Sequence, residues 1–167
     1  AGFDVLSVAN NHIGDWGLTA YEDTLNRLRS VGIAAVGGGY NGDDARKVKI
    51  ITKDGVKIGF LGFSDVGPAW MSGHDNLPTV LLASDPNFES IIREASRQVD
   101  HLVVSIHFGD EYESASNERQ RVLAHRAIDT GAHIVIGHHP HVREELEKYN
   151  GGVIAYSLGN FIFDQPF

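Results

Sequence analysis

The chain has 167 residues, with 22 acidic and 14 basic side chains, a formal net charge of −8 and no cysteine. This length suits one domain, which we expect to span residues 1–167. The lack of cysteine excludes thiol nucleophiles, zinc–thiolate sites and iron–sulfur clusters. The acidic balance, without any Lys/Arg run, argues against nucleic acid as a partner. No apolar run approaches the ~20 residues of a membrane helix.

Apolar periodicity predicts alternating strands and helices in the N-terminal half of the chain. The Asp54-Gly55 pair between two apolar runs predicts a hairpin. The segment 64–84 is rich in Gly, Pro, Asp and Asn and is expected to be a long loop, which is usually functional or mobile. The other expected elements are a strand over 4–9, a helix over 18–31 ended by Gly32, a strand over 33–36 and the hairpin strands 48–52 and 56–63.

The C-terminal half repeats this alternation. Asp85 and Pro86 predict the N-cap and first position of a helix that runs to about Val99. The expected elements that follow are a strand over 101–106, a helix over 117–130 closed by Gly131, a strand over 132–136 and a hairpin of 145–149 with 153–156. Strands that alternate with helices predict an α/β fold with a mixed sheet covered by helices.

Polar clusters follow four of the predicted strands. In open α/β sheets, binding sites assemble at the carboxyl ends of strands, so the four clusters are expected to meet. Nine histidines in the chain also hint at metal or proton chemistry. The clusters are Asn10–His12, His107–Tyr112, His138–His141 and Ser157–Asn160.

The histidine clusters predict a metal site. His139 and His141 lie two positions apart in a turn and can converge with His107, and imidazole binds Zn, Mn, Fe, Co or Ni. The alternative is a surface turn that is merely rich in histidine. Asn11 would offer an amide oxygen to the metal, and His12 would protonate a leaving group or stabilise an oxyanion. The alternative for these two residues is turn chemistry.

Several interpretations remain open for other polar residues near these clusters. Glu111 would be a metal ligand, a group that orients a ligand, a general base or a solvated loop carboxylate. Asn160 and Asp164 have similar alternatives. Alternation of side chains along the extended turn is expected to turn His138 away from the cluster.

Four ordered motifs carry a resemblance to a known family. They are Ala9–His12, His107–Tyr112, Gly137–Val142 and Tyr156–Gln165. Together they resemble the bacterial capsule-synthesis protein family associated with poly-γ-glutamate, a branch of the calcineurin-like metallophosphoesterase superfamily. The resemblance implies a β-sandwich with flanking helices, an α/β fold that some schemes class as α+β, and two divalent metal ions, which would be Mn, Fe or Zn.

The resemblance also implies roles for particular residues. Asn11, His107 and His139 would bind one metal ion and His141 the other. His12 and Glu111 would be catalytic, with His12 contacting the transferring phosphoryl group. The residues expected around the ions or the substrate are Asn10, Tyr112, Asn160 and Asp164.

The chain departs from the family pattern at its N-terminal side. Family members complete the metal site with acidic residues from a preceding segment, and no such motif occurs in these 167 residues. The chain thus resembles part of a family member, incomplete at both ends. Because carboxylates compensate the metal charge, we expect weak metal binding and weak or no turnover from this chain alone.

Three functions remain open from the sequence. In the first, the full protein is a metal-dependent hydrolase that acts on an anionic or polymeric substrate of the bacterial cell envelope. In the second, the domain is a non-catalytic accessory module of an envelope-polymer synthesis or export machine. In the third, the chain is a partial fold that forms a homodimer through an exposed strand edge. The resemblance implies an extracytoplasmic, membrane-associated place for the full protein, although this chain contains no targeting segment.

Overall fold

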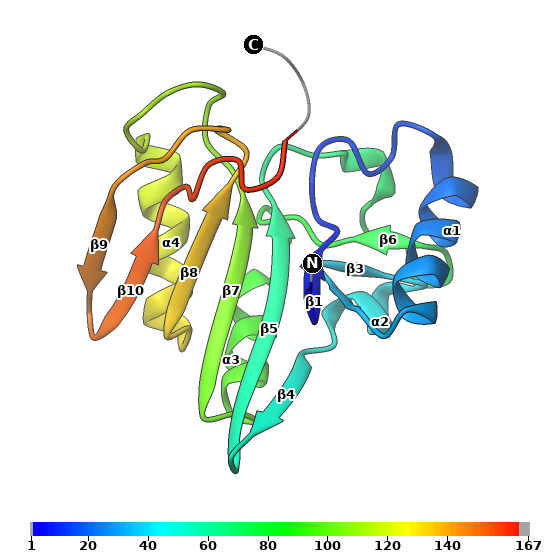
Figure 1. The fold of residues 1–167 in the computed structure, drawn as a ribbon, viewed down its shortest axis with the longest axis horizontal. Coiled ribbons are helices and arrows are strands. Elements are labelled where there is room, and N and C mark those ends of the chain that lie inside the picture. The colour runs from blue at the N-terminus through cyan, green and yellow to red at the C-terminus, as the bar shows by residue number, and fades with distance from the viewer. Residues whose placement is uncertain (1, 164–167) are drawn as a thin grey trace.

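The computed structural model describes residues 2–163, and its centre is one six-stranded mixed sheet (Figure 1). The four inner strands are parallel to one another, whereas both edge strands run antiparallel to their neighbours. In spatial order the strands are β4 (Lys49–Lys53), β5 (Val56–Ser64), β7 (His101–His107), β8 (Ile134–His138), β10 (Gly152–Ala155) and β9 (Leu146–Tyr149). This arrangement confirms the predicted α/β class.

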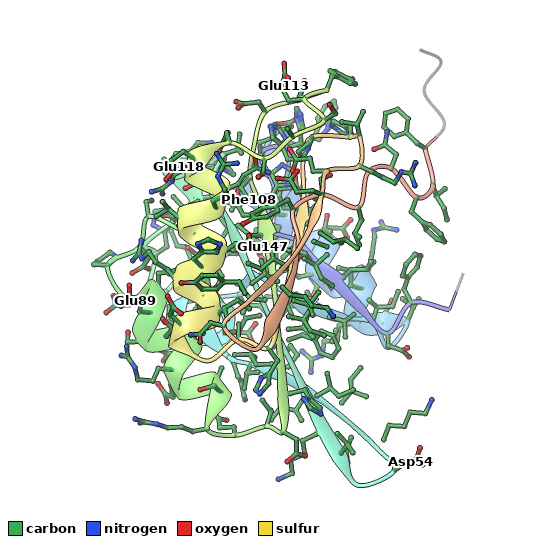
Figure 2. All side chains as sticks on the ribbon, turned by 90° about the vertical axis from the view of Figure 1, so that its left-hand side faces the viewer. Asp54, Glu89, Phe108, Glu113, Glu118 and Glu147 are labelled. Atoms are coloured by element: carbon green, nitrogen blue, oxygen red, sulfur yellow. The ribbon has the colours of Figure 1, made fainter. Side chains whose placement is uncertain are left out.

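Two helices, α3 (Phe88–Ser96) and α4 (Glu118–Thr130), cover one face of this sheet, as the side view in Figure 2 shows. Between helices and sheet lies the larger apolar core, in which the Phe63 ring of β5 packs 4.7 Å from the Phe88 ring of α3. Burial under helices explains why the inner strands are almost continuously apolar.

Residues 5–46 and 69–80 together form a smaller layer with its own apolar core around Tyr21, Leu25 and Met71. It includes helices α1 (Gly17–Ser30) and α2 (Gly42–Arg46). Its strands form a parallel pair, β1 (Val5–Ser7) with β2 (Ala34–Val36), and an antiparallel pair, β3 (Gly38–Gly39) with β6 (Thr79–Val80). The strands β1 and β2 contact β5 and lie on the face of the main sheet opposite α3 and α4 (Figure 2).

Helix ends follow from local sequence. At the end of α1, the Gly32 N–H donates to the Arg29 carbonyl and the Ile33 N–H donates to the Leu28 carbonyl, with Gly32 in the left-handed region. This pair of bonds is the Schellman motif that glycine favours. At the start of α4, Asn117 and Gln120 form a reciprocal capping box.

Both predicted hairpins are confirmed, but several other predictions change. The segment 64–84, expected to be a loop, contains β6 and the short 3-10 helix η1 (Ala69–Met71). Helix α3 begins at Phe88 rather than Pro86, because the Asp85 side chain accepts from the Asn87 N–H and closes a turn ahead of the helix. Elements of two to five residues, such as β3 and α2, are too short to show a period.

Within residues 2–163, no helix has the length and apolar composition needed to cross a bilayer.

Candidate metal centre

The polar clusters that follow β1, β7 and β8 meet on one edge of the molecule. The first direct link joins Asn11, after β1, to His107, at the end of β7, with 2.9 Å between Asn11 Oδ1 and His107 Nε2. The two residues lie 96 positions apart in the sequence. The folded chain therefore brings together two groups that the sequence places in different halves.

His107 is 7% exposed and contacts two polar neighbours through its two ring nitrogens. Its Nδ1 lies 2.7 Å from Nδ1 of His138. Burial first, and then the neighbouring histidines, lower the pKa of His107 to about 2. Burial and His139 likewise lower the pKa of His138 to about 4. Both imidazoles are therefore neutral at physiological pH, which is the form in which histidine binds a metal ion.

Glu111, His139 and His141 form a second group. Their potential ligand atoms all lie within 4.8 Å of one another. Burial lowers the pKa of His139, and the nearby Glu111 carboxylate partly offsets this effect. The His139 ring centroid is 4.6 Å from that of His107 and 6.3 Å from that of His141. His139 thus stands between the Asn11–His107 pair and the Glu111–His141 pair.

His141 is oriented by two further residues. The Asn160 Oδ1 atom lies 2.8 Å from His141 Nδ1, which leaves Nε2 of His141 available for another partner. The Tyr112 ring stacks on His141 with 5.9 Å between centroids, and the Tyr112 N–H donates to the Pro140 carbonyl. Asp164, the other residue expected here, lies outside the described residues.

Strained backbone conformations occur at three residues of the candidate metal centre. His139, His141 and Tyr112 have φ angles of 116°, 64° and 63°, which are unusual for bulky residues. Such conformations persist only where the surrounding structure enforces them, and they cluster at functional sites. Gly137, just before the histidines, is required, because a Cβ there would lie 1.8 Å from the Tyr156 carbonyl oxygen and 2.4 Å from the Phe108 ring.

His12 lies at the rim of the centre. Its side chain is 72% exposed, and its Nδ1 lies 2.8 Å from the Asp15 carboxylate. The Asn10 side chain accepts from the His12 N–H, so Asn10 shapes the turn that presents His12. An exposed imidazole held by a carboxylate is suited to donating a proton or stabilising developing negative charge.

Sequence reasoning missed three residues of this centre. His138 was expected to point away, but β8 continues through His138, which is opposite His107 in the parallel ladder and faces it. Ser105 contacts His138 from β7, with 2.9 Å between Ser105 Oγ and His138 Nε2. Asp15 was also missed, although its spacing of three residues after His12 is a usable signal for an orienting carboxylate.

The donor types fit divalent transition ions. Imidazole nitrogens suit Zn, Mn and Fe, while one carboxylate and one amide oxygen broaden the choice towards harder ions. The two described groups are close enough to share His139. A groove of about 810 Å³ opens beside His141 and contains Arg143, Asn160 and Phe163 in its lining. The arrangement can hold metal and leaves adjoining space for a substrate.

The whole chain is similar to capsule proteins. Residues 1–165 match the model of the bacterial capsule synthesis protein family. The chain is 46% identical over 164 residues to the PGA biosynthesis protein CapA of Bacillus subtilis, covering 98% of this chain and 43% of that protein. It is 36% identical over 172 residues to the capsule biosynthesis protein CapA of Bacillus anthracis, covering 99% of this chain and 41% of that protein. The chain thus spans less than half the length of these relatives.

Solved structures show the same kind of fold. A Staphylococcus aureus protein assigned as a 5′-nucleotidase, in complex with α-ketoglutarate, matches with a TM-score of 0.64 and 21% identity, covering 95% of this chain and 32% of that one. A hypothetical protein from Thermus thermophilus matches with a TM-score of 0.59 and 19% identity, covering 95% of this chain and 54% of that one. The chain shares the fold of these two structures, and it belongs to the bacterial capsule synthesis protein family.

Proposed function

We propose that this chain carries the metal-binding part of a divalent-metal-dependent hydrolase that takes part in capsule poly-γ-glutamate biosynthesis. The observation that carries the proposal is the convergence of His107, His139, His141 and Glu111 from β7, β8 and the segments that follow them. The phosphoesterase-like fold and the family both support it.

Two half-sites would hold the ions. Asn11 and His107 belong to the first, Glu111 and His141 to the second, and His139 lies between them. When bound, divalent ions supply Lewis-acid polarisation of a phosphoryl or amide-like oxygen. Glu111 also keeps the role of general base, since its carboxylate reaches the same space.

His12 acts from the rim. Asp15 holds its Nδ1, so Nε2 faces the other way and can donate a proton to a leaving group. Tyr112 and Asn160 keep His141 in place, and the Tyr112 ring, 59% exposed, offers a surface on which substrate can pack. Asn10 fixes the turn before His12.

The substrate would be an anionic or polymeric component of the cell envelope, bound in the groove beside His141. With a net charge of −8, the chain is poorly suited to bind a polyanion directly, so bound cations would bridge the two. The capsule-synthesis relatives are consistent with an envelope role. An extracytoplasmic, membrane-associated place for the full protein is part of the proposal, as is a homodimer through an exposed strand edge. Nucleic acid is not proposed as a partner.

The test measures metal content and turnover together. The chain is stripped of metal, reloaded separately with Mn²⁺, Fe²⁺ or Zn²⁺, and assayed by elemental analysis, thermal melting and hydrolysis of bis-p-nitrophenyl phosphate. We expect bound metal and a rise in melting temperature, both lost in His139→Ala, because His139 contacts both half-sites. Turnover, if present, is lost with them. His101→Ala, an exposed histidine at the start of β7, is the matched control and should behave as wild type.

A non-catalytic accessory role is the second candidate. It is favoured by a Mycobacterium tuberculosis relative, 31% identical over 172 residues, whose name describes a probable polyglutamine synthesis accessory protein. Metal binding without turnover, together with metal-dependent retention of purified poly-γ-glutamate, would favour this role. Polymer retention that survives EDTA would contradict cation bridging. If the chain holds no metal after incubation with each ion and hydrolyses no bis-p-nitrophenyl phosphate, the hydrolase proposal is rejected for this chain.

A further inference from the structure

Beneath the candidate metal centre, four side chains form a continuous polar chain that leads into the sheet. Ser105 Oγ lies 2.9 Å from His138 Nε2, His138 Nδ1 lies 2.7 Å from His107 Nδ1, and His107 Nε2 lies 2.9 Å from Asn11 Oδ1. Every ring nitrogen of both histidines therefore has a polar partner. Ser105 and His138 have no place in the hydrolase chemistry proposed above.

The strand register explains why these side chains meet. His107 and His138 are partners in the parallel ladder of β7 and β8, and Ser105 lies two residues before His107 on the same face of β7. Gly137 allows β8 to continue past Phe108 and the Tyr156 carbonyl up to this point. The chain is held by backbone pairing rather than by a loop, so its geometry is rigid.

In the metal-free protein, hydrogen-bond chemistry fixes where each proton lies. The Asn11 amide oxygen can only accept, so His107 carries its proton on Nε2. A buried imidazole is neutral, so Nδ1 of His107 accepts from Nδ1–H of His138. Nε2 of His138 is then free to accept from the Ser105 hydroxyl. All donors point from Ser105 towards Asn11.

Metal binding at His107 requires the opposite order. A ligand nitrogen must offer its lone pair, so Nε2 of His107 loses its proton and Nδ1 gains one. Nδ1–H of His107 then donates to Nδ1 of His138, and Nε2–H of His138 donates to Ser105. The proton of His107 Nε2 passes to solvent, the proton of His138 Nδ1 moves to His107 Nδ1, and a solvent proton replaces it at His138 Nε2 by way of the Ser105 hydroxyl. The two rings together keep the same number of protons.

We propose that His138, held by Ser105, is the positioning residue for the metal ligand His107, and that the hydrogen bonds along Ser105, His138 and His107 reverse direction when a divalent ion binds. A carboxylate or carbonyl behind a ligating histidine can only accept. A second imidazole can either donate or accept, so His138 remains a hydrogen-bond partner of His107 both with and without metal. This inference rests on the proposed metal-binding function.

The first measurement follows the ring protons directly. Nitrogen-15-labelled histidine spectra of the chain are recorded before and after Zn²⁺ addition, with assignments from His107→Asn and His138→Asn. We expect His107 to change from the Nε2–H to the Nδ1–H tautomer, and His138 from Nδ1–H to Nε2–H. Zinc binding at His107 without a tautomer change at His138 overturns the inference and leaves the proposed function standing.

The second measurement compares zinc affinities by calorimetry. His138→Leu removes both hydrogen bonds and should weaken binding by about 10- to 100-fold. His138→Asn keeps an oxygen near the position of Nδ1 and should recover part of that loss. His101→Leu, on the distant end of β7, is the matched control and should bind as wild type.

The possible outcomes separate the two claims. Wild-type affinity in a folded His138→Leu variant contradicts the positioning role alone. Should His138→Leu fail to fold, the zinc affinity of His138→Asn decides: binding weaker than wild type supports the positioning role, and wild-type affinity contradicts it. A wild-type chain that binds no zinc rejects the metal site itself, and the inference with it.

Discussion

The burial of His107 sets how the metal-free protein responds to acid. In the unfolded chain this imidazole takes up a proton near its ordinary pKa of about 6.5, whereas burial holds the pKa in the folded state at about 2. Between these values the unfolded state binds more protons, so the free energy of unfolding falls as the pH drops below about 6.5. The lowered pKa of His138 acts in the same direction.

We therefore expect metal-free protein to lose stability on acidification, with His107 contributing up to about 2 kcal/mol between pH 6.5 and pH 5. Urea unfolding at about pH 7.5 and about pH 5 measures this change. His107→Asn should show a smaller drop, because it removes one proton-binding group, while His101→Asn should keep the wild-type drop. Equal drops in wild type and His107→Asn would contradict this account.

Single residues also explain why the centre sits where it does. Tyr112, His139 and His141 hold strained backbone conformations beside one another, and Asn160 and Tyr112 both act on His141. Motif spacing indicated these residues as candidates, yet nothing in the spacing revealed the grouping of Glu111 with His139 and His141. The division of ligands between two ions stays a prediction.

At the scale of an element, α4 connects the site to the core. Its N-cap Asn117 accepts from the Gln120 N–H, and its amide also donates to Asp110 in the segment that carries Glu111. Helix α3 offers a natural comparison, because its N-cap Asn87 makes no capping hydrogen bond through its side chain.

Asn117→Ala should lower the free energy of unfolding by about 1 kcal/mol, because it leaves a helix N–H without its acceptor. The control Asn87→Ala should change stability by less than about 0.5 kcal/mol. Urea unfolding of both variants at one pH is the measurement. A loss in Asn87→Ala as large as that in Asn117→Ala would show that the capping bond is not the cause.

At the scale of the whole molecule, the site depends on close contact between the small N-terminal layer and the main sheet. Asn11 belongs to the small N-terminal layer, and His107 belongs to β7 of the main sheet. The layers approach where Gly37 passes over Gly62 of β5, and a Cβ on Gly62 would lie 2.9 Å from the Gly37 Cα. Two glycines at this crossing let the backbones come close enough for the Asn11–His107 contact.

Gly62→Ala should therefore destabilise the fold by about 1–3 kcal/mol, because backbone atoms must move apart to admit the methyl group. It should also weaken zinc binding, since Asn11 shifts away from His107. Gly59→Ala, on the same strand, has side-chain methyl groups of Val48 and Val99 rather than backbone as its nearest neighbours and is the matched control. Calorimetry and urea unfolding of both variants should show stability loss in each but reduced zinc affinity only in Gly62→Ala.

The sequence by itself determined the α/β class, the longer helices, both hairpins and the residues that carry chemistry. These features are local: periodicity marks a helix or strand, Asp54-Gly55 marks a turn, and polar motifs follow strand ends. The family is also readable from the motifs, and the match over residues 1–165 confirms it.

Only the tertiary structure decided which of these groups touch. Asn11 meets His107 across 96 residues because the small layer packs on the main sheet, and His138 meets Ser105 across 33 residues because β7 pairs with β8. No local pattern encodes either contact. The short strands β3 and β6 exist because neighbouring segments supply their hydrogen bonds and burial, not because their own two-residue sequences favour a strand. Ligand geometry depends on long-range contacts, so the sequence named the metal-site candidates while the fold arranged them.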